Sequence, residues 1–203
     1  MTSKRRAPHC GPFDVGRCQD HGVAVPEAPL EQTDTGRVPA GEGWYVLNAR
    51  EARWWYGPGR GAYSALEGAQ DFPQLGFNIV VLGPGEAMAM YHWEVDQEDF
   101  LVVAGEALLV VEGEERPLRP WDFFHCPSGT KHTIVGAGSG YAAIIAVGAR
   151  QHQEGPGWGG YTVDETARRH GASAERDTKD PSEAYAPLVK RERVTYQDGW
   201  LPG

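Results

Sequence analysis

The sequence contains few cysteines and no long hydrophobic run. Its three cysteines, Cys10, Cys18 and Cys126, are an odd and sparse set, which argues against a disulfide framework and favours a reducing cytoplasm. No apolar run approaches the roughly 18 residues that a membrane span needs. The basic N-terminus also lacks the apolar segment of a signal peptide. We therefore expect a cytoplasmic protein without a membrane partner.

Basic residues are also scarce, and helix-compatible stretches are short. Lys and Arg number 19 against 28 Asp and Glu, a formal net charge of −9, and an acidic surface repels phosphate backbones. Nucleic acid is therefore not expected as a partner. The 27 glycines and 15 prolines interrupt the chain every few residues and leave little room for long helices.

The 203 residues suffice for one domain with a hydrophobic core and additional arms. Residues 1–40 are rich in Pro, Gly and charge and show no sustained period, so we expect an extended N-terminal arm. Residues 41–150 carry the β-prone runs of a barrel. In 151–203 we expect a C-terminal extension with a short helix, capped by Asp164 and ended by Gly171, and a second helical turn after Asp180.

Short β-prone runs alternate with tight-turn signals through the central segment. The runs are WYVLNAR (44–50), FNIVVL, AMAMYHWE, DFLVVA, ALLVVE, RPLRP, DFFHC, HTIVG and YAAIIAV. Turn signals such as Gly83-Pro84-Gly85 and Glu112-Gly113 separate them. Many strands at short, even spacing predict an all-β fold, an antiparallel sandwich or barrel.

One stretch, MYHWEVDQEDF, crowds a histidine and several carboxylates against an apolar strand. Strand alternation places His92 and Glu94 on one face. The three residues after Glu94 suffice for a hairpin loop, which would bring Glu98 beside that pair. A further candidate is His132, at the start of a strand after a turn containing Pro127 and Gly129. These imidazoles and carboxylates are ligand types for a divalent metal.

The spacing of these residues resembles the two motifs of the cupins. The first motif, G-x5-H-x-H-x3,4-E-x6-G, is matched by Gly85, His92, Glu98 and Gly105, with one extra residue after Gly85. The second, G-x5-P-x-G-x2-H-x3-N, is matched by Pro127, Gly129 and His132. The resemblance covers roughly residues 75–150 and implies a single cupin domain, a jelly-roll barrel or double-stranded β-helix. It also implies a homodimer, because cupins commonly dimerise through N-terminal strands.

The sequence departs from the cupin pattern at three motif positions. Glu94 stands where the second histidine is usual, Trp121 where glycine is usual, and Gly136 where asparagine is usual. The family's metal ligands therefore carry over directly to His92, Glu98 and His132, and to Glu94 by position alone. Two imidazoles with carboxylates favour Fe(II) or Mn(II), with Zn or Ni as further candidates.

Two arrangements of this site are open. Glu94 is either a fourth ligand or a base beside a 2-His-1-carboxylate set of His92, Glu98 and His132. The first function hypothesis is a metal-dependent enzyme acting on a small organic molecule inside the barrel, with oxygenase chemistry first and isomerase or epimerase chemistry second. The alternative is a cupin that binds a small ligand or metal without catalysis, as a sensor or storage module.

Several further residues have expected places. Met88, Met90 and Phe100 are expected in the pocket wall. Alternation makes Cys126 a packed core thiol and His125 a surface imidazole. The aromatic run RWWYGPG, residues 53–59, is expected to pack an N-terminal strand. In the arm, His9, Cys10, Cys18 and His21 are zinc-ligand types, but their spacing lacks the C-x2-C knuckle of a finger, so we do not predict a zinc site there.

Overall fold

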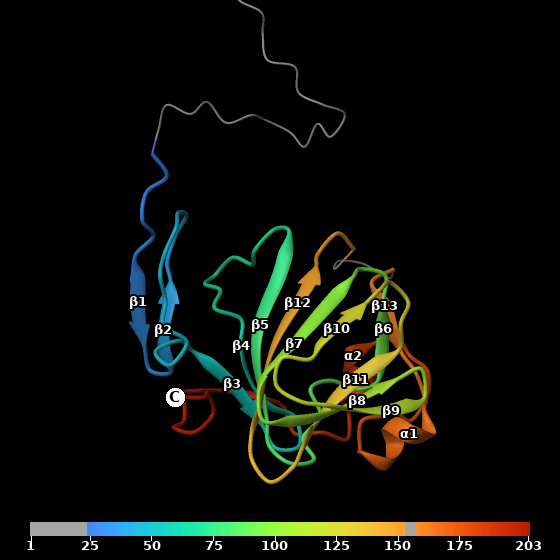
Figure 1. Ribbon diagram of the computed structural model, residues 1–203. Coiled ribbons are helices and arrows are strands. Elements are labelled where there is room, and N and C mark those ends of the chain that lie inside the picture. The colour runs from blue at the N-terminus through green and yellow to red at the C-terminus, as the bar shows by residue number, and fades with distance from the viewer. Residues whose placement is uncertain (1–23, 153–156) are drawn as a thin grey trace, which may run out of the picture.

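Two antiparallel sheets face each other in the computed structural model, which describes residues 24–152 and 157–203. They form a jelly-roll arrangement that does not close into a continuous barrel (Figure 1). The all-β expectation is confirmed. Within the described residues no helix is long and apolar enough to cross a membrane. The arm residues His9, Cys10, Cys18 and His21 lie outside the described residues.

The larger sheet has seven strands in the order β10-β7-β12-β5-β4-β3-β14. Its strands, taken along the chain, are β3 (Trp54–Gly57), β4 (Gly61–Ser64), β5 (Leu75–Leu82), β7 (Glu98–Ala104), β10 (Phe123–Cys126), β12 (Ala142–Ala149) and β14 (Glu192–Val194). The central pair of β12 and β5 is in register over all eight residues. Both faces of β5 pack at its C-terminal end: Val80 and Leu82 belong to one core cluster, and Val81 belongs to another.

The smaller sheet has five strands in the order β13-β6-β11-β8-β9. They are β6 (His92–Glu94), β8 (Glu106–Val111), β9 (Glu114–Leu118), β11 (His132–Ala137) and β13 (Gly159–Tyr161). The hairpin between β8 and β9 turns at Glu112-Gly113, where both residues have positive φ. Two residues with φ above zero are typical of a tight hairpin turn. The turn predicted at Glu112-Gly113 is therefore present.

The core lies between the two sheets. Fully buried side chains from the larger sheet, such as Leu82, Val102 and Ile144, pack against Leu109 and Ile134 of the smaller sheet. Cys126 belongs to this cluster with 3% of its surface exposed, whereas His125 is exposed and pairs with Asp99. The predicted core thiol and surface imidazole are therefore confirmed.

The loop between β6 and β7 differs from the sequence-based expectation. Residues 95–97 were predicted to form a hairpin, but β6 lies in the smaller sheet and β7 in the larger one. The loop therefore crosses from one sheet to the other. Asp96, which is buried in this loop, accepts hydrogen bonds from the backbone N and Nδ1 of His152, each at 2.7 Å. These bonds tie the crossover to the end of β12, so loop length alone did not determine the pairing.

The segment 44–50 is not a strand, although its sequence suggested one. Trp44 makes only an isolated bridge to Glu27, and the chain then turns at residues 49–51. Strands β3 and β4 follow instead. Trp54 of the predicted aromatic run is fully buried and packs against Trp200, with ring centroids 5.2 Å apart. The run therefore packs as expected, and its partner comes from the C-terminus.

The C-terminal segment contributes to both sheets. Strand β13 pairs with β6 and β14 pairs with β3. Two short helices lie between them, α1 (Glu165–Arg169) and α2 (Pro181–Ala184). Asp164 caps α1 by accepting from the Ala167 backbone N, and Asp180 caps α2. Gly171 follows α1 with φ of +66°, so the predicted helix signals are confirmed.

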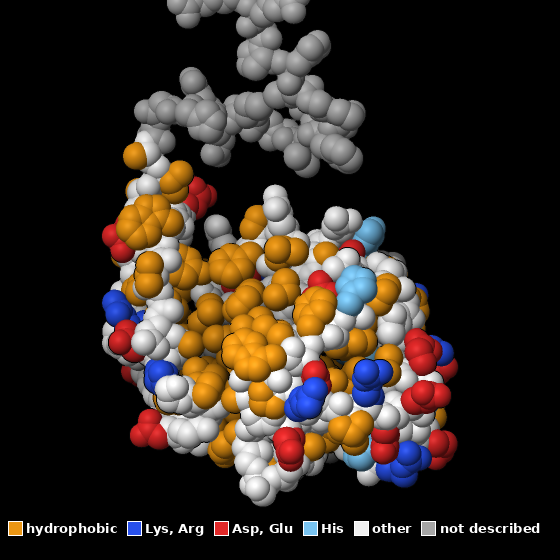
Figure 2. Space-filling view, in the orientation of Figure 1, with side chains coloured by type: hydrophobic (Ala, Val, Ile, Leu, Met, Phe, Trp, Pro, Cys, Tyr) orange, Lys and Arg blue, Asp and Glu red, His pale blue; other side chains and the backbone are white. Residues whose placement is uncertain are grey.

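A separate hairpin stands beside the larger sheet. It consists of β1 (Leu30–Thr33) and β2 (Gly36–Pro39), and it forms the described end of the predicted N-terminal arm (Figure 1). Figure 2 shows hydrophobic side chains gathered over the outward face of the larger sheet next to this hairpin. On that face Ile145 lies opposite Ile79 and Leu101, and Leu101 lies opposite the exposed Phe123.

Two departures from the cupin pattern have visible structural settings. Trp121 has φ of +74°, a conformation that favours glycine, which is the usual residue there. Gly136 is packed so closely that a Cβ would lie 2.1 Å from the carbonyl oxygen of Gly83. The asparagine usual at this position would therefore not fit without a backbone shift.

Candidate metal centre

Three ligand-type side chains converge between the sheets, from the first residues of three strands. His92 begins β6 and His132 begins β11, and the two are direct Cα partners across the antiparallel pair. Glu98 begins β7 on the facing sheet. One potential ligand atom from each lies within 4.8 Å of the others. The crossover after β6 therefore still brings Glu98 to His92, but across the barrel rather than within a hairpin.

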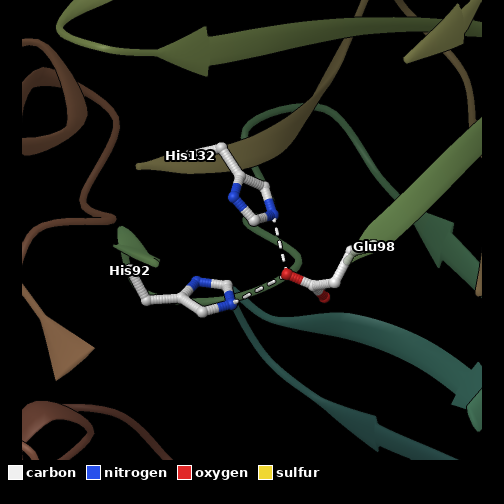
Figure 3. A group of neighbouring side chains, drawn as sticks. All are labelled: His92, Glu98 and His132. Carbon is white, nitrogen blue, oxygen red and sulfur yellow. Dashed lines mark ion pairs between the residues drawn. The ribbon is translucent and has the colours of Figure 1, made fainter. Parts of the chain in front are cut away.

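Both imidazoles direct Nε2 toward the same carboxylate oxygen (Figure 3). The distance to Glu98 Oε2 is 3.5 Å from His132 Nε2 and 3.9 Å from His92 Nε2. These separations exceed an N–H···O hydrogen bond. The three donor atoms thus surround a point that none of them occupies, as the ligands of one ion do.

The other nitrogen of each ring is already used. Nδ1 of His92 donates to the carbonyl oxygen of Met90 at 2.8 Å, and Nδ1 of His132 donates to that of Thr130 at 3.1 Å. A carbonyl only accepts, so the proton of each neutral ring is on Nδ1 and the lone pair is on Nε2. Backbone carbonyls commonly orient metal-binding histidines in this way.

The unpartnered atoms of the cluster fit a cation. Nε2 of His132 and Oε2 of Glu98 are buried and have no hydrogen-bond partner among the residues that the structure describes. Buried polar atoms are rarely left unsatisfied, because each costs about 1–3 kcal/mol. A lone pair and a carboxylate oxygen that face each other need a positive charge or a proton between them. The residues present therefore fit a divalent metal ion held by two imidazoles and one carboxylate.

The electrostatics of the cluster follow from burial. Burial, followed by the charge of His92, lowers the pKa of His132 to about 3, so this ring is neutral at physiological pH. Burial raises the pKa of Glu98 to about 7. Burial lowers the pKa of His92, but the carboxylates of Glu94 and Glu98 outweigh that effect and the net pKa is raised. Without a metal, burial thus favours the neutral form of Glu98, and the two carboxylates favour the charged form of His92.

Glu94 lies at the margin of this cluster. Its Oε1 is 3.7 Å from His92 Nε2, and its side chain is 30% exposed, compared with 17% for Glu98. The three-residue group with mutually close donor atoms does not include it. Of the two arrangements that the sequence left open, this geometry corresponds to His92, Glu98 and His132 as the ligand set with Glu94 beside it.

A cavity of about 190 Å³ opens beside the cluster. Its walls include Met88 and Phe100, two of the residues predicted for the pocket. Met90, also predicted there, instead packs against Tyr161, Ala174 and Ala184 on another side of the chain. The chain bends from Met88 to Tyr91 rather than continuing as a strand, which breaks the alternation on which the Met90 prediction depended.

The cavity also has polar walls that sequence reasoning missed. Tyr63 and Asn78 come from β4 and β5, and Arg191 comes from the C-terminal segment just before β14. Asn78 lies in the β-prone run FNIVVL and Tyr63 lies outside the predicted runs, and no spacing rule connects either residue to the motifs. Arg191 lies 59 residues after His132, and no local sequence signal indicates that it returns to the barrel.

Comparison with known proteins identifies the central domain. Residues 78–148 match the family model for the cupin domain. No curated protein matches the sequence. The matched range contains His92, Glu98 and His132 but not Arg191.

Three solved structures illustrate the similarity of fold. A Cupin 2 conserved barrel domain protein from Salinispora arenicola is 19% identical over 55% of this chain and 92% of its own, with a TM-score of 0.44. KdgF from Halomonas sp. is 24% identical over 49% and 90%, with a TM-score of 0.41. A sugar phosphate isomerase from Silicibacter pomeroyi is 28% identical over 51% and 62%, with a TM-score of 0.38.

The similarity has a limited extent. This chain spans 62% of the length of the Silicibacter pomeroyi protein, so the activity in that protein's name is not transferred to it. The family match rests on the domain itself. Together, the two sequence motifs, the facing antiparallel sheets and the match over residues 78–148 show that this part of the chain is a domain of the cupin superfamily.

Proposed function

We propose that the protein is a metal-dependent cupin enzyme that acts on a small organic molecule in the cavity beside His92, Glu98 and His132. The observation that carries the proposal is the convergence of two Nε2 lone pairs and one carboxylate oxygen. Within the described part of the chain, His132 Nε2 and Glu98 Oε2 are buried without a partner. A buried set of this kind is costly unless it is used.

The donor set favours iron or manganese. Two imidazoles and one carboxylate are the ligands of non-haem Fe(II) oxygenases. A divalent ion bound here supplies Lewis acidity and open coordination positions for substrate or O₂. Oxygenase chemistry is therefore our first candidate for the reaction.

The side chains of the protein set the conditions for that chemistry. Met88, Val80 and Phe100 give the cavity an apolar wall that excludes water. Tyr63 and Asn78 provide polar groups in the same cavity that can orient a substrate. The volume of about 190 Å³ lies below the roughly 300–1,000 Å³ of pockets for drug-sized ligands, which supports a small substrate.

Isomerase or epimerase chemistry is the second candidate, with Glu94 as the base. A partly exposed carboxylate, 3.7 Å from His92 Nε2 and outside the three-ligand group, can accept a proton from a substrate carbon and return it. In the oxygenase case the same carboxylate shuttles a proton. A cupin that binds a small ligand or metal without catalysis is the alternative from another class.

Metal analysis of the purified protein tests the proposal. We expect about one equivalent of Fe or Mn in the wild type, loss of metal in His132→Ala, and retention in Glu94→Gln. The exposed imidazole of His125 offers a matched control, because His125→Ala removes the same group and leaves the metal content unchanged. A folded wild type that remains metal-free after incubation with Fe(II), Mn(II) and Zn(II) would refute the proposal.

Two further measurements separate the alternatives. Consumption of O₂ in the presence of small organic substrates, dependent on His132, supports the oxygenase. Exchange of substrate hydrogen with deuterated water, lost in Glu94→Gln but without O₂ consumption, supports the isomerase. Absence of both from metal-loaded protein favours the non-catalytic binder. The homodimer stays a prediction, which light scattering on the purified protein tests.

A further inference from the structure

Arg191 reaches the metal-site cavity from outside the cupin motifs. It precedes β14 in the C-terminal segment and forms part of the same cavity wall as His92, Glu98 and His132. Its NH2 group donates to the carbonyl oxygen of Met88 at 3.0 Å and to that of Arg60. These bonds hold the guanidinium at the wall of the cavity.

This guanidinium has no carboxylate partner in residues 24–152 and 157–203. Among the described residues, the ion pairs involve neither Arg191 nor Arg60, and Nε of both is buried without a hydrogen-bond partner. Each guanidinium also lies over an aromatic ring. The Arg191 guanidinium lies 5.0 Å from the centroid of the Tyr63 ring, and that of Arg60 lies 4.0 Å from the centroid of the Tyr185 ring.

Burial of the Arg191 guanidinium is energetically unfavourable. Burial, and next the charge of Arg60, lower the pKa of Arg191 to about 10, so it remains a cation at neutral pH. Glu86 has the smallest of the effects that raise this pKa, and its carboxylate accepts hydrogen bonds from the backbone N of Gly83 and from Tyr56. A buried cation without a counter-charge is unfavourable, and an anion in the cavity would relieve it.

The charge of the metal site does not supply that anion. Glu94 and Glu98 are the carboxylates beside the two histidines, and together they offset the charge of one divalent ion. The arginines then remain uncompensated. An Arg guanidinium binds carboxylate and phosphate oxygens through paired N–H groups.

From this arrangement we infer that Arg191 is a substrate-recognition residue that binds an oxyanion, a carboxylate or phosphate group, on the molecule held at the metal site. The inference rests on the proposed function, because it assigns the substrate class of the same cavity. Arg60, whose charge acts on Arg191, adds positive charge near the cavity. The C-terminal segment thereby supplies the specificity of a site whose ligands come from the cupin barrel.

A purely structural role for Arg191 predicts a different result. Its bonds to the Met88 and Arg60 carbonyls would matter for stability alone, and anion binding would not depend on it. Arg193, two residues later, is exposed and lies over Trp55. Arg193→Gln therefore removes the same charge from the same segment without touching the cavity, and is the matched control.

Isothermal titration calorimetry on the Mn(II)-loaded protein tests the inference, with inorganic phosphate in one arm and acetate in the other. For the preferred anion we expect Arg191→Gln to raise Kd at least tenfold, as loss of a charge-assisted contact does. Arg193→Gln leaves Kd within about twofold. Arg191→Lys, which keeps the charge but not the fork, gives an intermediate Kd and serves as the test if Arg191→Gln does not fold.

The two arms also identify the group that is recognised. Tighter binding of phosphate assigns a phosphorylated substrate, and tighter binding of acetate a carboxylic acid. Any direct contact of the anion with the metal is common to all variants, so the ratio of Kd values isolates the arginine.

Failure of the inference can be told from failure of the proposed function. Equal Kd values in wild type and Arg191→Gln, equal weakening in both glutamine variants, or no binding of either anion to metal-loaded wild type would overturn the role of Arg191. Metal content is measured on the same samples. Inability of the wild type to hold metal overturns the proposed function instead.

Discussion

Replacing Glu98 by glutamine should stabilise the metal-free protein at alkaline pH and at the same time abolish metal binding. The carboxylate is largely buried, with 17% of its side chain exposed, and burial raises its pKa from 4.5 to about 7. The folded state therefore binds this proton more tightly than the unfolded state does. Its contribution to stability is fully present below pH 4.5 and is lost as the pH rises through 7.

The size of the effect follows from that difference in pKa. Each pKa unit corresponds to 1.36 kcal/mol, so between pH 5 and pH 8 the ionisation of Glu98 should cost the folded wild type up to about 2.5 kcal/mol. The neutral amide of Glu98→Gln does not ionise and can donate to the Nε2 lone pairs. The variant should therefore gain up to this amount relative to wild type at pH 8 and almost none at pH 5.

Urea unfolding followed by tryptophan fluorescence measures this difference, since the chain contains seven tryptophans. Both proteins are compared at pH 5 and pH 8 in the presence of a chelator, with the exposed Glu114→Gln as control. In a separate measurement without chelator, Mn(II) at 100 times its Kd should raise the free energy of unfolding of the wild type by about 2.7 kcal/mol and leave that of Glu98→Gln unchanged. If the two proteins lose stability in parallel from pH 5 to pH 8, or if the variant is the less stable at pH 8, the electrostatic reasoning is wrong.

Three further predictions concern the framework around the site. Gly136→Ala places a Cβ about 2.1 Å from the Gly83 carbonyl oxygen and should destabilise the protein by about 2 kcal/mol or more, whereas Gly140→Ala, with nothing within 4 Å, should not lower the melting temperature. Trp54→Ala empties a fully buried site and should cost about 3–5 kcal/mol in urea unfolding; a loss below 1 kcal/mol would contradict its place in the core. Burial raises the pKa of Cys126 to about 12, so in a variant without the two arm cysteines this thiol should react with a thiol reagent only after unfolding, and fast labelling of the native state would count against this structure.

The sequence predicted correctly that Glu98 lies near His92, but it predicted the wrong connection between their strands. The sequence predicted that His92 and Glu98 meet because a three-residue loop can close a hairpin. In the structure they meet because the loop crosses between sheets that face each other. The motif spacing carried the right result, whereas local turn geometry could not distinguish a hairpin from a crossover of the same length.

Met90 and the 44–50 segment show the limit of pattern reasoning in the same way. Alternation holds only while the chain is a strand, and the bends from Met88 to Tyr91 end it. The apolar run at 44–50 has strand propensity, yet among the described residues it pairs with a neighbouring segment only through the isolated bridge of Trp44 to Glu27. Strand propensity depends on packing partners, and single-sequence reasoning does not see them.

By itself, the sequence determined the all-β class, the turns and helix caps, and three of the site residues, because each depends on local chemistry or on fixed spacing: His92, Glu98 and His132. Only the tertiary structure decided that Glu98 reaches the histidines across the barrel, that Glu94 lies at the margin of the cluster, and that Arg191 enters the cavity from the C-terminal segment. These facts depend on which distant segments pack together, and burial of apolar surface over the whole chain sets that packing.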